Sequence, residues 1–295
     1  MKRLEDIVIP PLAVVSHDAG GANHIISWLK DYNKKVRACM EGPAKIIWEN
    51  SFPNNKLLSM NKALEDSKTL ISGTGAGDLE RFARIQAKKR NIKNIAVIDH
   101  WTEYEKRFVH NGKELLPDLI LVGDKYALNK ARNFFPSVSV IQLPNSYLQQ
   151  EAELSSSQRE KDCKTPIENI LIIGEPLKDK TANEQFMPIE FLMENLNKIN
   201  LSKKLLKINL RPHPSESTAR YSFLKNKYED LVTEFTINSN KELYKDIAWA
   251  DLVVGVSSFA LMISLKAGVP TMSILPTGQN IPELHHTNLL YLRDM

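Results

Sequence analysis

The sequence has few cysteines, since Cys39 and Cys163 are the only two among its 295 residues. Neither belongs to a Cys-x-x-Cys pair or to a cluster of cysteines and histidines. Zinc sites and disulfide frameworks need such closely spaced side chains. We therefore expect neither a metal site nor a disulfide.

Long apolar runs are also missing. The first residues, MKRLEDIVIPPLAVVSHDAGG, begin with basic side chains, but acidic residues and a Pro-Pro pair interrupt the apolar run before it reaches signal-peptide length. No stretch approaches the roughly 20 apolar residues that a membrane span needs. We expect a cytoplasmic protein whose contact with the inner membrane, if it makes one, is peripheral.

Charge of one sign is not in large excess. The chain carries 39 basic and 35 acidic residues, a formal net charge of +4. This balance suits an anionic small ligand or a lipid surface, but it falls short of the basic surface that nucleic-acid binding requires. We expect no nucleic-acid partner.

What the sequence does contain is a series of short apolar runs, each followed by a longer amphipathic segment. This alternation is typical of βα units in a parallel sheet. It predicts strands at residues 12–16, 69–72, 95–99, 119–123 and 138–143, and again at 169–174, 205–210, 231–235, 252–256 and 271–275. It predicts helices at residues 22–30, 78–90, 125–135, 189–199, 217–228 and 258–267.

The length of the chain predicts two domains, because it fits two doubly wound units of roughly 130 to 150 residues each. The stretch SYLQQEAELSSSQREKDCKTP, near residues 148–166, is polar and lacks apolar periodicity, as linkers do. We expect an α/β protein with two Rossmann-like domains facing each other across a cleft. The domains are placed at residues 1–150 and 166–295, with a linker at 151–165.

In open α/β sheets, ligands bind beyond the carboxyl ends of the strands, so the turns that follow the strands are the candidate sites. The first turn, SHDAGGAN, opens a helix and carries His17, Asp18, Gly20, Gly21 and Asn23. Its glycines let the backbone approach a ligand, and His17 and Asp18 form a possible acid/base pair. The alternative is a tight turn in which Asp18 caps the helix. The pattern is not Gly-x-Gly-x-x-Gly, which disfavours NAD.

Two further turns in the first half carry chemistry. Gly73, Thr74 and Gly75 follow the second predicted strand in a glycine-rich turn. Titratable and aromatic side chains follow the third strand, where they would form a platform for a sugar or base, and they are Asp99, His100, Trp101 and Glu103. The alternatives are close helix–strand packing for the first turn and a capped turn with core aromatics for the second.

The second half offers an anion site. The turn Arg211-Pro212-His213-Pro214 fixes an imidazole between two prolines beside an arginine, which suits a phosphate or pyrophosphate. The turn that carries Gly255, Ser257 and Ser258 opens another helix, whose N–H groups and hydroxyls can donate to a phosphate. Plain helix capping would also explain the serines. Gly174, at the end of the first strand of this half, is expected to lie near the same anion.

The motif RPHP, followed by DIAWADLVVGVSSFALMISLKAGVP, resembles the donor-binding domain of GT-B glycosyltransferases. It is most similar to bacterial sialyl- and polysialyltransferases with a His-Pro motif and to capsule and teichoic-acid transferases. The likeness covers residues 165–280 by motif and the rest by architecture. It implies that His213, Ser257 and Ser258 hold the donor phosphate and that Asp18 is the general base, with Asp99 or Glu103 as the alternative base.

The resemblance also implies a donor and a reaction. The stretch ISLKAG lacks the glutamate with which many UDP-sugar enzymes hold the ribose, which favours a CMP donor. The expected function is transfer of a sialic-acid-like nonulosonate from CMP to a hydroxyl of a bacterial surface glycan, without a metal or another cofactor. The remaining alternatives are a UDP-sugar epimerase or hydrolase, a CDP-glycerol glycerophosphotransferase, and a non-catalytic nucleotide-sugar-binding module. The chain is short for this class and ends where many such enzymes carry a helix that crosses back to the first half.

Overall fold

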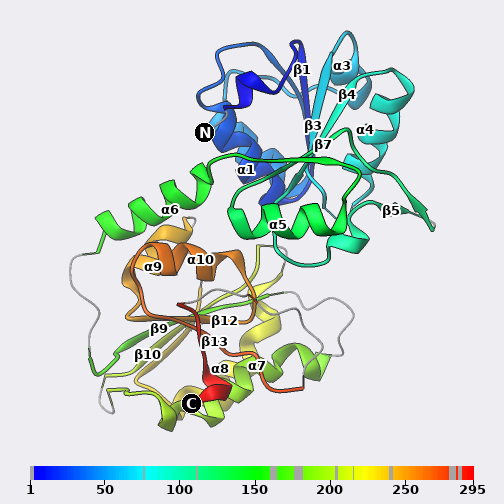
Figure 1. Ribbon diagram of the computed structural model, residues 1–295. Coiled ribbons are helices and arrows are strands. Elements are labelled where there is room, and N and C mark those ends of the chain that lie inside the picture. Colours follow the sequence, from blue (N-terminus) through cyan, green and yellow to red (C-terminus); the bar gives the residue numbers. More distant parts are fainter. Residues whose placement is uncertain are drawn as a thin grey trace. The chain divides into compact units, whose positions relative to one another are not determined.

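The computed structural model of the chain describes residues 3–75, 77–110, 112–159, 165–175, 182–202, 205–214, 216–238, 242–278, 284 and 288–295. The chain divides into two compact units, Met1–Tyr147 and Leu148–Met295. Each unit holds a six-stranded parallel sheet with helices around it, which confirms the predicted α/β class with two Rossmann-like units (Figure 1).

The sheet of the first unit has the strand order β2-β1-β3-β4-β7-β8. Its strands are β1 (Leu12–Ser16), β2 (Val36–Met40), β3 (Thr69–Ser72), β4 (Lys93–Ile98), β7 (Leu119–Val122) and β8 (Ser139–Gln142), and a small antiparallel pair joins β5 (Val109–His110) to β6 (Lys113–Glu114). The helices are α1 (Ala19–Leu29), α2 (Gly42–Ser51), α3 (Met60–Leu64), α4 (Asp78–Lys89) and α5 (Lys125–Phe134), with 3₁₀ turns at Leu4–Asp6 and Tyr104–Lys106.

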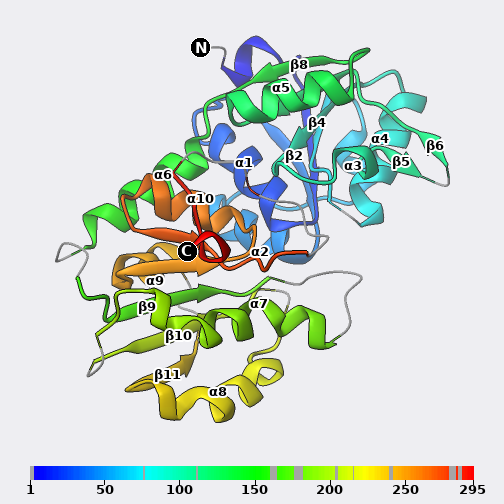
Figure 2. The ribbon, with the colours of Figure 1, turned by 60° about the horizontal axis from the view of Figure 1, so that its bottom comes forward.

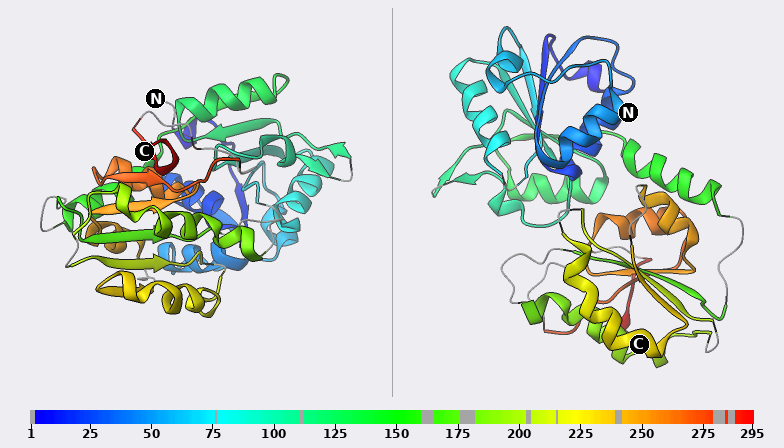
Figure 3. Two further views of the ribbon diagram at one scale, coloured as in Figure 1. Left: turned by 90° about the horizontal axis from the view of Figure 1, so that it is seen from below. Right: turned by 180° about the vertical axis from the view of Figure 1, so that it is seen from behind.

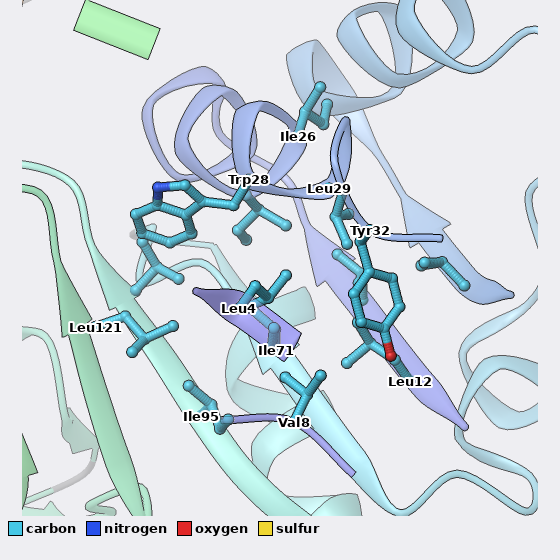
Figure 4. Packing of buried hydrophobic residues seen from close by; sticks show 14 of the residues in the cluster. Leu4, Val8, Leu12, Ile26, Trp28, Leu29, Tyr32, Ile71, Ile95 and Leu121 are labelled. Carbon is cyan, nitrogen blue, oxygen red and sulfur yellow. The ribbon is translucent and has the colours of Figure 1, made fainter. Parts of the chain in front are cut away.

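Alternate residues of β1 lie in two different cores, one on each face of the sheet, because successive side chains of a strand point to opposite faces. Leu12 belongs to the core under α1, together with Trp28 and Leu29 of that helix. Figure 4 shows these side chains packed toward Ile71 and other strand residues. Ala13 and Val15 instead join the core under α3 and α4. The first sheet is therefore covered on both faces, as all-parallel sheets require.

The sheet of the second unit has the order β11-β10-β9-β12-β13-β14, and β9, β10 and β11 lie side by side in Figure 2. Its strands are β9 (Asn169–Ile173), β10 (Lys207–Arg211), β11 (Glu234–Ile237), β12 (Leu252–Gly255), β13 (Thr271–Ser273) and β14 (Leu290–Tyr291). Its helices are α6 (Ser146–Ser157), which begins at the division, α7 (Ala182–Glu194), α8 (Ser222–Tyr228), α9 (Leu243–Trp249) and α10 (Phe259–Lys266), with 3₁₀ turns at Leu196–Lys198, Thr218–Tyr221, Glu229–Leu231 and Leu292–Asp294. Helices lie on both faces of this sheet as well (Figure 3).

Every predicted strand is present, but the structure adds elements. The edge strand β2 and the helices α2 and α3 fill the stretch between the first two predicted strands. The strand predicted at 231–235 forms later, at Glu234–Ile237, because a 3₁₀ turn occupies Glu229–Leu231. The helix predicted at 189–199 begins earlier and contains Pro188, and it gives way to a 3₁₀ turn at Leu196–Lys198.

The segment predicted as a linker begins with a helix. Helix α6 spans Ser146–Ser157, and the Ser156 hydroxyl donates to the carbonyl of Ala267 at 3.1 Å. Its buried positions are the small residues Ala152 and Ser155. A helix that buries only small side chains shows no apolar periodicity, which explains why the sequence pattern missed it. Residues 160–164 of the expected linker lie outside the described part of the chain.

Candidate functional site

Each sheet has one place where the strand order reverses direction, and ligands of open α/β sheets bind at the carboxyl edge there. In the first unit it lies between β1 and β3, which are neighbours. In the second unit it lies between β9 and β12. The turns after these four strands carry predicted site residues, and two other strands supply the rest: β4 precedes the turn with Asp99, and β10 precedes the Arg-Pro-His-Pro turn.

The turn after β1 brings His17 and Asp18 together. Their side chains share a hydrogen bond of 2.7 Å between His17 Nδ1 and Asp18 Oδ1, and they remain 38% and 43% exposed. The bond to Asp18 raises the pKa of His17, against the opposing effect of burial. Asp18 stands at the N-cap of α1, but its side chain accepts no capping hydrogen bond. Its carboxylate is therefore bound to His17 and remains accessible at the carboxyl edge of the sheet. Asn23 is partly buried in α1.

A residue that the sequence analysis missed, Glu80 of α4, reaches the same turn. Its side chain is fully buried, and Oε1 accepts hydrogen bonds from the His17 amide at 2.9 Å and the Ser16 hydroxyl at 3.3 Å. Its other oxygen, Oε2, is buried and has no hydrogen-bond partner among the described residues. Burial raises the pKa of Glu80, and the charge of Asp18 adds to the rise. In a sequence, a glutamate at the third position of a helix is usually explained as part of a capping box. The sequence therefore did not indicate that Glu80 contacts the turn after β1.

The glycines after β3 are required because these carboxyl groups lie against the backbone. A Cβ at Gly75 would overlap Asp18 Oδ2 and lie 3.1 Å from Glu80 Oε2, and a Cβ at Gly73 would lie 2.6 Å from Glu80 Oε1. A Cβ at Gly21 would lie 3.0 Å from the Cα of Gly73. The glycines thus permit close packing and admit two carboxyl groups of the chain itself, whereas ligand binding by this turn stays a prediction.

The turn after β4 holds Asp99 in a second polar cluster. Arg107, which the sequence analysis missed, donates from Nη1 to Asp99 Oδ1 at 2.9 Å and to the Thr74 hydroxyl at 2.7 Å. Burial alone would raise the pKa of Asp99, but the nearby charges, led by that of Arg107, lower it. A Cβ at Gly20 would overlap Asp99 Oδ2, so the first turn of α1 packs directly on this carboxylate. His24 of α1 is buried behind it, and burial lowers its pKa.

The other predicted residues of this turn do not form an open platform. Trp101 is almost fully buried, and its indole N–H donates to Asp124 Oδ2 at 2.7 Å. His100 packs at 5.4 Å from the Trp101 ring, centroid to centroid. Glu103 is exposed and forms an ion pair with Lys106 at 2.9 Å. Trp101 is thus a core aromatic, which is the alternative that the sequence left open.

In the second unit, the turn between β12 and α10 holds an anion that belongs to the chain itself. Glu175, two residues after β9, accepts hydrogen bonds on Oε1 from the amides of Val256 at 3.0 Å, Ser257 at 2.8 Å and Ser258 at 2.8 Å. Its Oε2 accepts from the Ser257 hydroxyl at 3.0 Å. We call these four donors the anion seat. Burial raises the pKa of Glu175, although the four donors oppose the rise.

The anion seat uses the two serines differently. The Ser258 hydroxyl accepts from the Ala260 amide at 3.3 Å and so caps α10, whereas the Ser257 hydroxyl donates to Glu175. Sequence reasoning missed Glu175, because its partners lie about 80 residues away along the chain. A glutamate directly after the glycine that ends a strand was the available signal. The donors predicted to bind phosphate are thus occupied by the Glu175 side chain, and phosphate binding at this turn stays a prediction.

The Arg211-Pro212-His213-Pro214 turn is held by internal contacts. The guanidinium of Arg211 forms an ion pair with the buried Asp246, so Arg211 is engaged inside the unit. The Gly174 amide donates to the Arg211 carbonyl at 2.8 Å, and a Cβ at Gly174 would lie 3.1 Å from that oxygen and 3.2 Å from the Cα of Pro212. The His213 carbonyl accepts from the Glu216 amide at 2.8 Å.

Gly255 and Pro214 complete the predicted donor residues. A Cβ at Gly255 would lie 3.3 Å from side-chain atoms of Ile173 and Leu261, so this glycine permits close packing of α10 on the sheet. Pro214 lies in the turn after β10. Ser215, the next residue, lies outside the described residues.

A depression of about 850 Å³ lies at the opposite edge of the first sheet, where β2 begins. It is lined mainly by polar and basic side chains, among them Lys34, Lys35, Arg37, Lys56 and Lys62, and it includes none of the predicted site residues.

Among the described residues, no cluster of three or more His, Cys, Asp or Glu side chains is arranged to hold a metal ion. Cys39 is buried and free, and Cys163 lies outside the described residues. Within the described ranges, no helix is long and apolar enough to cross a membrane.

The sequence matches no protein-family model and no curated protein. Solved structures do match. The UDP-GlcNAc 2-epimerase of Methanocaldococcus jannaschii, in complex with UDP-GlcNAc and UDP, superposes with a TM-score of 0.61 at 12% identity, over 89% of this chain and 83% of that one. MurG of Acinetobacter baumannii gives 0.50 at 13% identity, over 97% and 87%. The chain has the GT-B fold.

A third structure is consistent with this assignment. HepE of Anabaena, in complex with UDP and glucose, gives a TM-score of 0.53 at 10% identity, over 94% of this chain and 84% of that one. The superpositions establish the GT-B fold, but at identities this low they establish nothing beyond the fold. The resemblance to sialyltransferases therefore remains a sequence-based expectation. Function must be argued from the sites, since one fold hosts many activities.

Proposed function

We propose that this GT-B protein is an enzyme acting on a nucleotide-linked sugar, and that it transfers the sugar to an acceptor hydroxyl. The observation that carries the proposal is the hydrogen-bonded His17–Asp18 pair, partly exposed at the switch point of the first sheet. An oriented His–Asp pair at such an edge is the arrangement that general acid–base catalysis uses. The CMP-linked nonulosonate expected from the sequence remains the proposed donor.

In the proposed reaction, Asp18 takes the proton of the acceptor hydroxyl, and His17 holds the carboxylate in place through Nδ1. The acceptor oxygen bonds to the anomeric carbon of the sugar while the bond from that carbon to the donor phosphate breaks. The electron pair leaves with the phosphate. His213 and the N–H groups of Ser257 and Ser258 are proposed to stabilise the departing negative charge.

The anion seat places a condition on this proposal. Its four donors are bound to Glu175, so a phosphate gains them only if the Glu175 carboxylate gives them up. Two anions do not share one set of donors, because their charges repel at contact distance. The donor-binding role of the serines therefore depends on displacement of Glu175.

A second function, sugar epimerisation, is favoured by one specific observation. Three titratable side chains, His17, Asp18 and Glu80, converge at the carboxyl edge of the first unit, which is enough to remove a proton and return it. The M. jannaschii neighbour is itself an epimerase. An epimerase or hydrolase would turn over the nucleotide sugar without an acceptor.

The first test is a thermal-shift screen with CMP, CDP, UMP, UDP, GDP and NAD, because a ligand that binds only the folded state raises Tm. A shift with CMP or CDP that is lost in His213→Ala supports the cytidine-linked donor, whereas UDP alone would favour the epimerase. His110→Ala, in the β5–β6 hairpin, is the matched control. Product analysis with CMP-sialic acid and UDP-GlcNAc, with and without acceptor glycan, then separates transfer from epimerisation. No shift with any nucleotide would contradict the proposal.

A further inference from the structure

The proposed reaction leaves the Glu80 carboxyl without a role, although it lies beside the proposed base. Glu80 is 0% exposed. Its Oε1 is occupied by the His17 amide and the Ser16 hydroxyl, while Oε2 is buried and finds no hydrogen-bond partner in the described part of the chain. An unsatisfied buried oxygen of a charged group is costly, so a proton on this oxygen would remove much of that cost.

Asp18 approaches the same point from the other side. A single atom placed at the Cβ position of Gly75 would overlap Asp18 Oδ2 and lie 3.1 Å from Glu80 Oε2. Glycine at this position is what allows two carboxyl groups to converge over one residue. The negative charge of Asp18 at this point opposes ionisation of Glu80 and adds to the effect of burial, which raises the pKa of Glu80.

The surroundings decide which member of the pair keeps the proton. Asp18 is 43% exposed and is hydrogen-bonded to the His17 imidazole. Glu80 is buried, and burial together with the charge of Asp18 raises its pKa. The proton therefore stays on Glu80.

The other charges near Glu80 do not reverse this assignment. Arg84, on the same helix, lowers the pKa of Glu80, but its Nη1 donates to the Gly73 carbonyl at 2.8 Å and forms no ion pair with Glu80 in the described structure. The charge of Glu41, from the turn before α2, acts on His17 and raises the pKa of the imidazole.

We propose that Glu80 holds a proton on Oε2 and shares it with Asp18, so that the two carboxyl groups and His17 form one acid–base unit. Glu80 is a positioning residue, because it acts through Asp18. It would orient the Asp18 carboxylate by donating a hydrogen bond to it, while the proton that Asp18 takes from the substrate stays on Asp18. This inference rests on the proposed function only for the catalytic role of Asp18, and the protonation of Glu80 is testable without any substrate.

The first experiment measures Tm of the wild type and of Glu80→Gln from pH 4 to pH 9. Glutamine reproduces a protonated glutamate in shape and charge. A raised folded-state pKa means that the native state holds its proton longer than the unfolded chain, so the wild type loses stability relative to Glu80→Gln as pH rises above the ordinary glutamate pKa. Glu49→Gln, at an exposed position of α2, is the matched control, and its Tm difference should not change with pH.

The second experiment measures the pH profile of turnover with CMP-sialic acid and UDP-GlcNAc as donors. Glu80→Gln should restore most of the kcat that Glu80→Ala loses near pH 7, a loss of roughly 100-fold that is expected when the Asp18 carboxylate is no longer held in place. The alkaline limb of the wild-type profile, where Glu80 gives up its proton, should be absent in Glu80→Gln.

The outcomes separate the two proposals. A wild type that gains stability relative to Glu80→Gln as pH rises, or a Glu80→Gln variant as inactive as Glu80→Ala, would overturn the protonated Glu80. If neither donor is turned over by any variant, the proposed function fails, while the Tm comparison still decides the protonation of Glu80.

Discussion

Replacing Glu175 by alanine tests the anion seat directly. The change removes the acceptor of three backbone N–H groups and of the Ser257 hydroxyl. Hydrogen bonds to a charged group contribute about 1.5–3 kcal/mol each. Against this, the variant no longer buries a carboxylate, whose desolvation is visible in the raised pKa of Glu175.

We expect these opposing effects to leave Glu175→Ala about 2–3 kcal/mol less stable, because the lost bonds outnumber the single desolvated group. For a unit of this size, that corresponds to a Tm lower by roughly 5–10 °C. Differential scanning calorimetry measures it, and Glu229→Ala, an exposed carboxylate on the same unit, is the control. A Glu175→Ala variant with the Tm of the wild type would refute the reasoning, since the four donors would then need no anion.

The same variant shows whether the seat accepts phosphate. Inorganic phosphate should raise the Tm of Glu175→Ala more than that of the wild type, because only the variant offers the four donors to a free anion. Equal shifts in both proteins would mean that phosphate binds elsewhere. In that case Ser257 and Ser258 would be capping residues, and the proposed role in holding the donor would be lost.

Three other substitutions probe the first unit. Gly20→Ala should lower stability by about 1–3 kcal/mol in urea unfolding, since the new methyl overlaps Asp99, whereas alanine ordinarily stabilises a helix. Asp18→Asn should lower the pKa of His17 in an NMR titration, and because a raised histidine pKa stabilises the fold only below that pKa, the stability difference from wild type should shrink from pH 6 to pH 9. Arg107→Ala should raise the pKa of Asp99, measured from its ¹³C carboxyl shift, and an unchanged value would contradict the charge effect assigned to Arg107.

The fold could be predicted from the sequence to a large extent because strands buried on both faces produce continuous apolar runs. Runs such as 12–16 and 252–256 became β1 and β12 with closely matching bounds. The edge strand β2, Val36–Met40, was missed because Arg37 interrupts its apolar residues and a lysine pair precedes it, so its pattern resembles a loop. Helix α6 was missed because its buried residues are small.

The candidate sites could be predicted where the chemistry lies beside a strand end. His17 and Asp18 are adjacent in sequence, and the structure joins them by a hydrogen bond. Trp101, by contrast, was read as part of an open platform, and the structure places its ring in the core with its N–H on Asp124. Exposure depends on what packs over a residue, and neighbours in sequence do not reveal that.

The sequence by itself determined the alternation of strands and helices, the two units, and which turns carry glycines, histidines and acids at strand ends. Only the tertiary structure decided what those turns touch. Glu80 meets His17 across 63 residues, and Glu175 meets Ser257 across 82. The physical reason is the order of strands in each sheet: β1 lies beside β3, and β9 beside β12, so crossover connections bring together turns that are distant along the chain.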